Sequence, residues 1–306
     1  MKTKLLKYVG YGVTVAAFAF LARSVASMHL DFSRLINPFA AVSCGLILSL
    51  GYAGIVYLSA YAWKMVLEFI RGSKISYRDV TGVYIKANLG KYFPGNVMHF
   101  AGRNLLAGKL GFKQMDVTFS SAVEVLALIA TAVIWSILLA LQRFTSILGN
   151  ILNRTDAAVF GVIAAFLFGA AVLGWAAITK GSYLQKYRRF FTRGFLKLLG
   201  KLFSVYSLTL IIPGIFLVMI FALVLGFQVT PQNALVIISA YIISWVAGFI
   251  VPGAPGGMGV RESVLLLVLG PMYSGDLAVL AAILHRLASM LGDAAAFLVE
   301  SGRRPK

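Results

Sequence analysis

Cysteine, histidine and acidic side chains are all scarce in this sequence. It contains one cysteine, Cys44, three histidines, and ten Asp and Glu against 28 Lys and Arg. A single cysteine excludes a disulfide or a cysteine-ligated metal site within one chain. The metalloprotease His-Glu-x-x-His motif, the phosphate-binding Gly-x-x-x-x-Gly-Lys-Ser/Thr loop and the Gly-x-Ser-x-Gly elbow are missing as well. We therefore expect no metal site, no cofactor and no enzymatic activity.

Charged residues of either sign make up only 12% of the 306 residues, whereas hydrophobic residues make up 60%. With a mean hydropathy of +0.88, this balance predicts an integral membrane protein. Its apolar stretches are continuous and near the ~20 residues that a spanning helix needs, which predicts an all-α polytopic membrane helix bundle. About six full spans are expected, at residues 8–27, 39–63, 117–141, 157–179, 202–227 and 277–299. For the first of these, a cleaved signal peptide is the alternative.

Two Pro-Gly breaks interrupt apolar sequence at matching places in the two halves of the chain. Proline lacks the amide donor and glycine permits unusual backbone angles, so both suit a sharp turn between two short helices. Interrupted segments at corresponding positions are the best sequence indication of a binding site in a transporter. Each break follows a Tyr-Ile pair and a glycine and precedes an arginine: Tyr84-Ile85, Gly90, Pro94-Gly95 and Arg103, then Tyr241-Ile242, Gly248, Pro252-Gly253 and Arg261.

Lysine and arginine gather on one side of the predicted membrane. Residues 64–113 carry nine of them, residues 180–201 carry seven, and the two tails carry three each. Because short cytoplasmic loops accumulate these residues, we expect both termini in the cytoplasm and the chain in the inner membrane. The segment 77–108 must then start and finish on the cytoplasmic side, and 232–270 on the opposite side. An amphipathic helix pair on the membrane surface is the alternative for the first segment.

These two hairpins divide the single membrane domain, residues 1–306, into two copies of one unit. The first repeat is 39–141 with its hairpin at 77–108, and the second is 202–300 with its hairpin at 232–270. Because the copies face opposite sides, they form an inverted-topology repeat. Irregular backbone at membrane depth is tolerated only where protein buries it or it lines a watery cavity. The two re-entrant tips are therefore expected to create a polar centre in the bundle.

Ionisable residues within the apolar segments are the candidates for a substrate site. A charge at a helix centre costs ~2.5–3.5 kcal/mol on insertion scales, so such residues usually face the bundle. In the repeat, Glu124 stands where His285 stands, and we interpret His285 and Asp293 as structural. For Glu124, Arg261, Glu262 and Arg286, structural salt bridges are the alternative to a substrate site. For Lys91 and Arg103, the alternative to a substrate pocket is positive-inside bias alone. The predicted substrate-binding residues are Lys91, Pro94, Gly95, Arg103, Glu124, Pro255, Gly256, Gly257, Arg261, Glu262 and Arg286.

The segment 180–201 mixes basic and aromatic residues, which is typical of an amphipathic loop on the cytoplasmic membrane surface. The net charge of +18 is explained by topology and by anionic lipid, so we expect no nucleic-acid partner. A homo-oligomer remains open, because small residues are too abundant to indicate one association face.

The two break regions resemble the signature loops of the lysylphosphatidylglycerol synthase transmembrane family, the flippase-like domain family. The similarity rests on Lys91-Tyr92-Phe93-Pro94-Gly95 and on Pro255-Gly256-Gly257-Met258-Gly259-Val260-Arg261-Glu262, and it extends from about residue 39 to 299. It implies a membrane domain that moves charged or glycosylated lipids between leaflets, with Pro94, Gly95, Pro255, Gly256, Gly257, Arg261 and Glu262 as family positions. The best-known members append a soluble aminoacyltransferase domain that has no counterpart here, so we expect no synthesis of aminoacyl lipid.

These observations together predict a flippase-like or scramblase-like transporter of an anionic phospholipid, a glycolipid or a polyprenyl-phosphate lipid. Substrate phosphate would displace carboxylates from the cations, or protonation of Glu124 or Glu262 would couple movement to a proton gradient. The alternative is an accessory subunit or embedded enzyme of lipid-linked glycan or phospholipid modification, working with a lipid-modifying partner enzyme through the same pocket.

Overall fold

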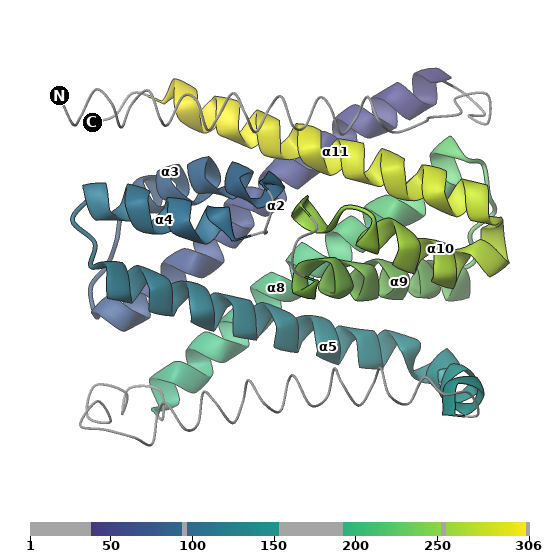
Figure 1. Cartoon of the computed structure of the whole chain (residues 1–306), viewed down its shortest axis with the longest axis horizontal. Helices are drawn as coiled ribbons and strands as arrows, with labels where there is room; N and C mark the ends of the chain where they lie inside the picture. The colour runs from purple at the N-terminus through teal and green to yellow at the C-terminus, as the bar shows by residue number, and fades with distance from the viewer. Residues whose placement is uncertain (1–37, 94–96, 153–191, 252–254, 304–306) are drawn as a thin grey trace.

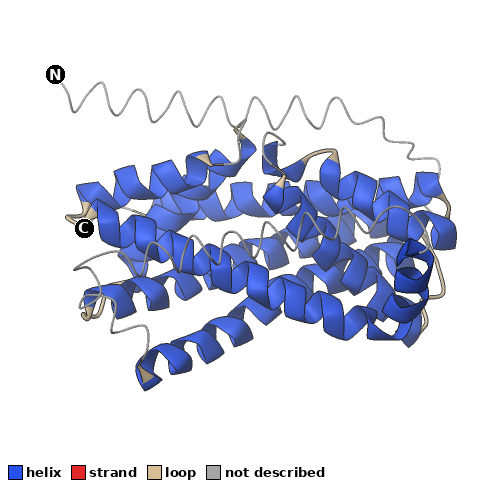
Figure 2. Cartoon of the chain, turned by 60° about the horizontal axis from the view of Figure 1, so that its bottom comes forward, coloured by secondary structure: helices blue, strands red, loops and turns tan. Residues whose placement is uncertain are grey.

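The computed structural model describes residues 38–93, 97–152, 192–251 and 255–303, and the described residues form helices joined by short loops, with no strand among them (Figures 1 and 2). The predicted spans 8–27 and 157–179 lie outside this part of the chain, as do Pro94, Gly95 and most of the 180–201 loop. The all-α prediction is confirmed for the described residues.

Five of the described helices are long and apolar enough to cross a membrane. Four overlap predicted spans, and the fifth, α9, is the first arm of the second predicted hairpin. At 20 residues, α9 is about 30 Å long and so reaches the thickness of a bilayer core by itself. The five helices are α2 (Pro38–Arg71), α5 (Gln114–Leu152), α8 (Arg193–Met219) with its π-helical extension η4 (Ile220–Val224), α9 (Pro231–Ile250) and α11 (Gly275–Gly302).

The remaining helices complete two helical hairpins. The first consists of α3 (Tyr77–Asn88), η2 (Leu89–Tyr92) and α4 (Met98–Lys109), and the second of α9, η5 (Pro255–Gly257) and α10 (Val260–Tyr273). In Figure 1 the first hairpin lies at the left of the bundle and the second at the right, between α11 above and α5 below, while α2 and α8 cross obliquely. The tips meet in the middle, since η2 contacts η5.

Glycine allows the arms of each hairpin to close tightly beside its tip. A Cβ on Gly90 would lie 2.7 Å from the backbone nitrogen of His99, where α4 begins. At the equivalent place in the second hairpin, a Cβ on Gly248 would lie 2.5 Å from Cγ of Arg261, near the start of α10. Gly256 and Gly257 also have positive φ angles, 57° and 76°, a region that other residues rarely adopt. The paired glycines of the sequence therefore mark the same packing problem in both halves.

Two apolar clusters hold the hairpins in place. One joins α8, α9, α10 and α11 around fully buried side chains such as Leu217, Phe221 and Ile242, and the other seats α3 against α2 around Trp63 and Ile85. The outer surface is also apolar, with Leu46, Leu50, Leu126, Leu267 and Leu298 among its exposed side chains. Such a surface is costly in water and suits a bilayer, which agrees with membrane insertion.

Candidate functional site

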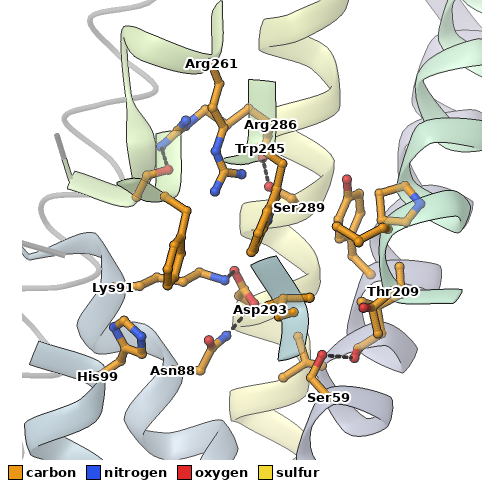
Figure 3. Close-up of a pocket in the computed structure, with 18 of the residues that line it drawn as sticks. Ser59, Asn88, Lys91, His99, Thr209, Trp245, Arg261, Arg286, Ser289 and Asp293 are labelled. Carbon is orange, nitrogen blue, oxygen red and sulfur yellow. Dashed lines mark hydrogen bonds and ion pairs between the residues drawn. The ribbon is translucent and has the colours of Figure 1, made fainter. Parts of the chain in front are cut away.

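A cavity of about 200 Å³ lies at the centre of the bundle, where the two hairpin tips approach each other (Figure 3). Both hairpins contribute to its lining, together with α2, α5, α8 and α11. The volume admits on the order of ten water molecules, or a lipid headgroup in their place. The polar centre that the two sequence breaks predict is thus present as a cavity.

Most of the predicted site residues come together in this cavity. Gly257 packs beside it, against Gly248 and Arg261, and Pro255 begins η5. Pro94 and Gly95 belong to the part of the chain that the structure does not describe. The predicted residues that line the cavity are Lys91, Arg103, Glu124, Gly256, Arg261, Glu262 and Arg286.

The first hairpin places one of its cations against α5. Arg103 of α4 forms an ion pair with Glu124 of α5, and both side chains are almost fully buried, at 3% and 5% exposure. The guanidinium carbon of Arg103 lies 3.9 Å from the centre of the Tyr84 ring, and the Tyr84 hydroxyl donates to the other Glu124 oxygen at 2.9 Å. Burial, pairing and the cation–π contact together fix this arginine in one position.

The tip of the first hairpin is bound to α11 through Asp293. Lys91 Nζ lies 2.7 Å from one carboxylate oxygen of Asp293, and Asn88 Nδ2 donates to the other at 2.7 Å. The Tyr92 hydroxyl also donates to Asp293. Three groups from one short stretch of chain therefore converge on a single buried carboxylate, which ties η2 to α11.

The second hairpin is bound to the same helix about two turns away. Arg286 Nη1 lies 3.1 Å from Glu262 Oε1 of α10, and Arg286 Nη2 donates to the carbonyl oxygen of Gly256 at 3.3 Å. Arg286 and Asp293 are seven residues apart, so they project from one face of α11. This face holds both hairpin tips.

Arg261 differs from the other cations of the cavity. Its guanidinium lies 5.8 Å from the centre of the Trp245 ring, and Figure 3 shows it beside Arg286 and across the cavity from Lys91 and Asp293. The cavity lining contains four Lys and Arg and three Asp and Glu side chains. Each carboxylate has a different cation as its partner. Among the described residues, Arg261 has no carboxylate within ion-pair distance, which leaves one positive charge in excess.

A second polar cluster contains His285, Tyr52 and the carbonyl group of Pro213. From the sequence, His285 was interpreted as structural, and its two partners were not predicted. His285 Nε2 donates to the carbonyl oxygen of Pro213 at 2.8 Å and lies 2.8 Å from the Tyr52 hydroxyl. Through these two contacts the imidazole links α11 to both α8 and α2. Asp293 was also interpreted as structural, yet it lines the cavity and binds Lys91. The seven-residue spacing from Arg286 was its only sequence signal.

The arrangement suits binding of an anion in a space enclosed by protein. The described residues contain no group of three or more His, Cys, Asp and Glu side chains placed to hold a metal ion. In comparisons with known proteins, no protein-family model and no curated sequence matches this chain. The family resemblance of the two break regions therefore stays a prediction.

Proposed function

We propose that this protein moves an anionic lipid, with a phosphate in its headgroup, between the two leaflets of the membrane. The observation that carries the proposal is the central cavity, where seven ionisable Asp, Glu, Lys and Arg side chains gather inside a bundle of apolar helices. Charges at membrane depth are costly and mark substrate or ion pathways. The excess of cations favours a negatively charged substrate, and arginine and lysine are the residues that bind phosphate.

The same proposal treats both hairpins as re-entrant and the two halves as an inverted repeat. Three observations support this. The hairpins open toward opposite ends of the bundle (Figure 1), and their tips contact each other at its centre. In addition, six of the 12 residues of α3 are buried and the helix packs against α2 and α11, which is unlike a helix lying on a membrane surface. In such folds the substrate site lies at the repeat interface near the midplane.

The ion pairs suggest how the site opens. Each hairpin tip is bound to α11 through one ion pair, Lys91 with Asp293 or Arg286 with Glu262. A headgroup phosphate would compete for the cations, weaken one of these contacts and allow one hairpin to move away from α11 while the other stays. The cavity would then face one leaflet at a time, as alternating access requires. The acyl chains would remain in lipid.

We further propose that the chain lies in the cytoplasmic membrane with its carboxyl end in the cytoplasm. The end of α11 lies near the start of α3, because Arg303 contacts the ring of Tyr57 and Tyr77 donates to the carbonyl oxygen of Tyr57. The open end of the first hairpin and Arg303 therefore share one end of the bundle. This agrees with the positive-inside rule.

Proteoliposomes provide the test. Fluorescent phosphatidylglycerol and a short-chain polyprenyl phosphate are incorporated, and the label that reaches the outer leaflet is measured by quenching. The wild type is expected to move at least one of them faster than protein-free vesicles, and Arg261→Ala is expected to abolish that difference. Lys109→Ala, which removes an exposed charge outside the cavity, serves as the control. Headgroup binding without any translocation would contradict the proposal and favour an accessory subunit.

A further inference from the structure

Five buried polar atoms on residues that line the cavity have no hydrogen-bond partner among the described residues, and two of the five lie on neighbouring residues. These two are Nε of Arg261 and Oε2 of Glu262, and the other three are Nδ1 of His99, Nε of Arg103 and Nε of Arg286. A buried donor or acceptor without a partner is costly, about 1–3 kcal/mol and more for a charged group. Such atoms are usually satisfied by ordered water or by a ligand. One of the two is a donor and the other an acceptor, so a ligand that satisfies both must accept at one point and donate at another.

The internal repeat explains why Arg261 lacks a carboxylate. Arg103 and Arg261 occupy equivalent places after the two breaks, and Arg103 is neutralised by Glu124. The residue equivalent to Glu124 in the second half is His285, which donates its Nε2 hydrogen to the carbonyl oxygen of Pro213. It therefore brings no negative charge to Arg261. The second half has the arginine of the repeat without its counter-ion.

A second guanidinium lies next to this arginine. A Cβ on Gly256 would lie 3.1 Å from Nη2 of Arg286, and a Cβ on Gly257 would lie 2.9 Å from Nε of Arg261. The two cations thus face adjacent residues of η5, and Glu262 pairs with Arg286 only through Oε1. Two arginines and one carboxylate therefore lie side by side, and the carboxylate pairs with Arg286 alone. Such a site attracts a phosphate, which can accept from both guanidinium groups.

We infer that this part of the cavity selects a phosphate headgroup that also carries a free hydroxyl, as glycerol, inositol or a sugar does, over a headgroup with an amine. The inference rests on the proposed function, since it names the headgroup of the lipid that the cavity receives. The phosphate binds Arg261, and a headgroup hydroxyl donates to Oε2 of Glu262. An ammonium group would be repelled by the excess of cations, and each carboxylate of the cavity already has a cation as its partner.

The wall beside Arg261 fits the same class of headgroup. Trp245 and Phe249 line the cavity, and their rings are stacked at a centroid distance of 5.3 Å and an interplanar angle of 11°. Pockets of this kind combine aromatic walls with a few polar groups that fix orientation. The carbon face of a polyol or sugar can pack on this wall while its hydroxyls reach Glu262.

Binding of short-chain lipids to the full-length protein in detergent tests the inference separately from transport. Isothermal titration calorimetry compares dihexanoyl phosphatidylglycerol, phosphatidic acid and phosphatidylethanolamine, with free glycerol 1-phosphate as a soluble probe. Phosphatidylglycerol should bind most tightly and phosphatidylethanolamine most weakly. Arg261→Gln breaks no ion pair and should weaken phosphatidylglycerol binding about tenfold or more, the loss expected for a charge-assisted hydrogen bond. Lys109→Gln, the matched control, should leave it unchanged.

The variant Glu262→Met separates recognition of the headgroup hydroxyl by Glu262 from binding of the phosphate by Arg261. It removes the acceptor and a competing negative charge, so phosphatidic acid should bind more tightly while the preference for phosphatidylglycerol disappears. Equal affinity of the wild type for phosphatidylglycerol and phosphatidylethanolamine, or unchanged binding in Arg261→Gln, would overturn the inference. Selective binding without translocation would support it and refute only the transport proposal. If glycerol 1-phosphate bound as tightly as the lipid, the headgroup chemistry would stand and a lipid as its source would be wrong.

Discussion

The ion pair between Arg103 and Glu124 should be the most costly single contact of the cavity to break. Both side chains are almost fully buried, and the Tyr84 hydroxyl also depends on Glu124 as its acceptor. Arg103→Met leaves an unpaired carboxylate in the interior. Removing one partner of a buried pair typically costs about 3–5 kcal/mol, because the remaining charge has lost its compensation.

Replacing both partners should cost much less. A buried ion pair exchanged for apolar side chains of similar size is often neutral, and here only the Tyr84 hydroxyl loses its acceptor, at about 1–3 kcal/mol. The double variant Arg103→Met, Glu124→Met should therefore be more stable than Arg103→Met alone. The free energy of unfolding is measured in mixed micelles with increasing dodecyl sulfate, followed by far-ultraviolet circular dichroism.

A double-mutant cycle measures the coupling free energy between Arg103 and Glu124. Strong non-additivity, with a coupling free energy of about 2 kcal/mol or more, is expected for a direct buried pair. Additive losses in the two single variants would show that Arg103 and Glu124 act independently. The interpretation that Glu124 neutralises Arg103 in the first half of the cavity would then be wrong.

Three further predictions concern the hairpins and α11. Gly90→Ala should lower the stability of the protein by about 1–3 kcal/mol through overpacking. Gly108→Ala serves as the control, because a Cβ at Gly108 would meet no atom within 4 Å, and thermal unfolding measures both variants. Lys91→Gln leaves the buried Asp293 carboxylate without its cation and should cost about 1–3 kcal/mol. This is less than for Arg103→Met, because Asn88 and Tyr92 still donate to Asp293. Asp293→Leu removes the acceptor of all three groups and should cost more, as measured by dodecyl sulfate unfolding. Arg261→Gln should leave the melting temperature unchanged or raise it, since it removes a cation that has no carboxylate partner among the described residues; a lower one would indicate a structural role.

Much of the fold could be predicted because it depends on local pattern. Long apolar runs indicate α2, α5, α8 and α11 directly, since the bilayer sets the length of a spanning helix. The repeated Tyr-Ile, Gly and Pro-Gly order located both hairpins, because the same close approach of two arms demands glycine in each half. The re-entrant path through the membrane was inferred from the distribution of Lys and Arg among the loops. That distribution indicates the side on which a loop lies and not how deep a hairpin enters the membrane, so the re-entrant path stays a prediction.

The site was harder to predict than the fold. Residues within or beside a break, such as Lys91 and Arg261, carry a local signal, and the predicted set includes them. Asp293 carries almost none, since a lone acid in an apolar helix can serve packing or binding equally well. Its role depends on Asn88 and Lys91, about 200 positions away in the sequence, and such pairings follow from helix packing that a single sequence does not specify.

Blocking the cavity is the most direct test of the claim that a lipid headgroup passes through it. Ser289 lines the cavity on α11, and Cys44 is the only cysteine of the chain. A Cys44→Ser, Ser289→Cys variant in proteoliposomes is treated with a sulfonate-bearing methanethiosulfonate reagent, which places a bulky anion beside the cations. Translocation of the anionic lipid should fall to the protein-free rate and return after reduction with dithiothreitol, while Cys44→Ser alone should be unaffected. Unchanged translocation after complete modification would contradict passage of the headgroup through the cavity.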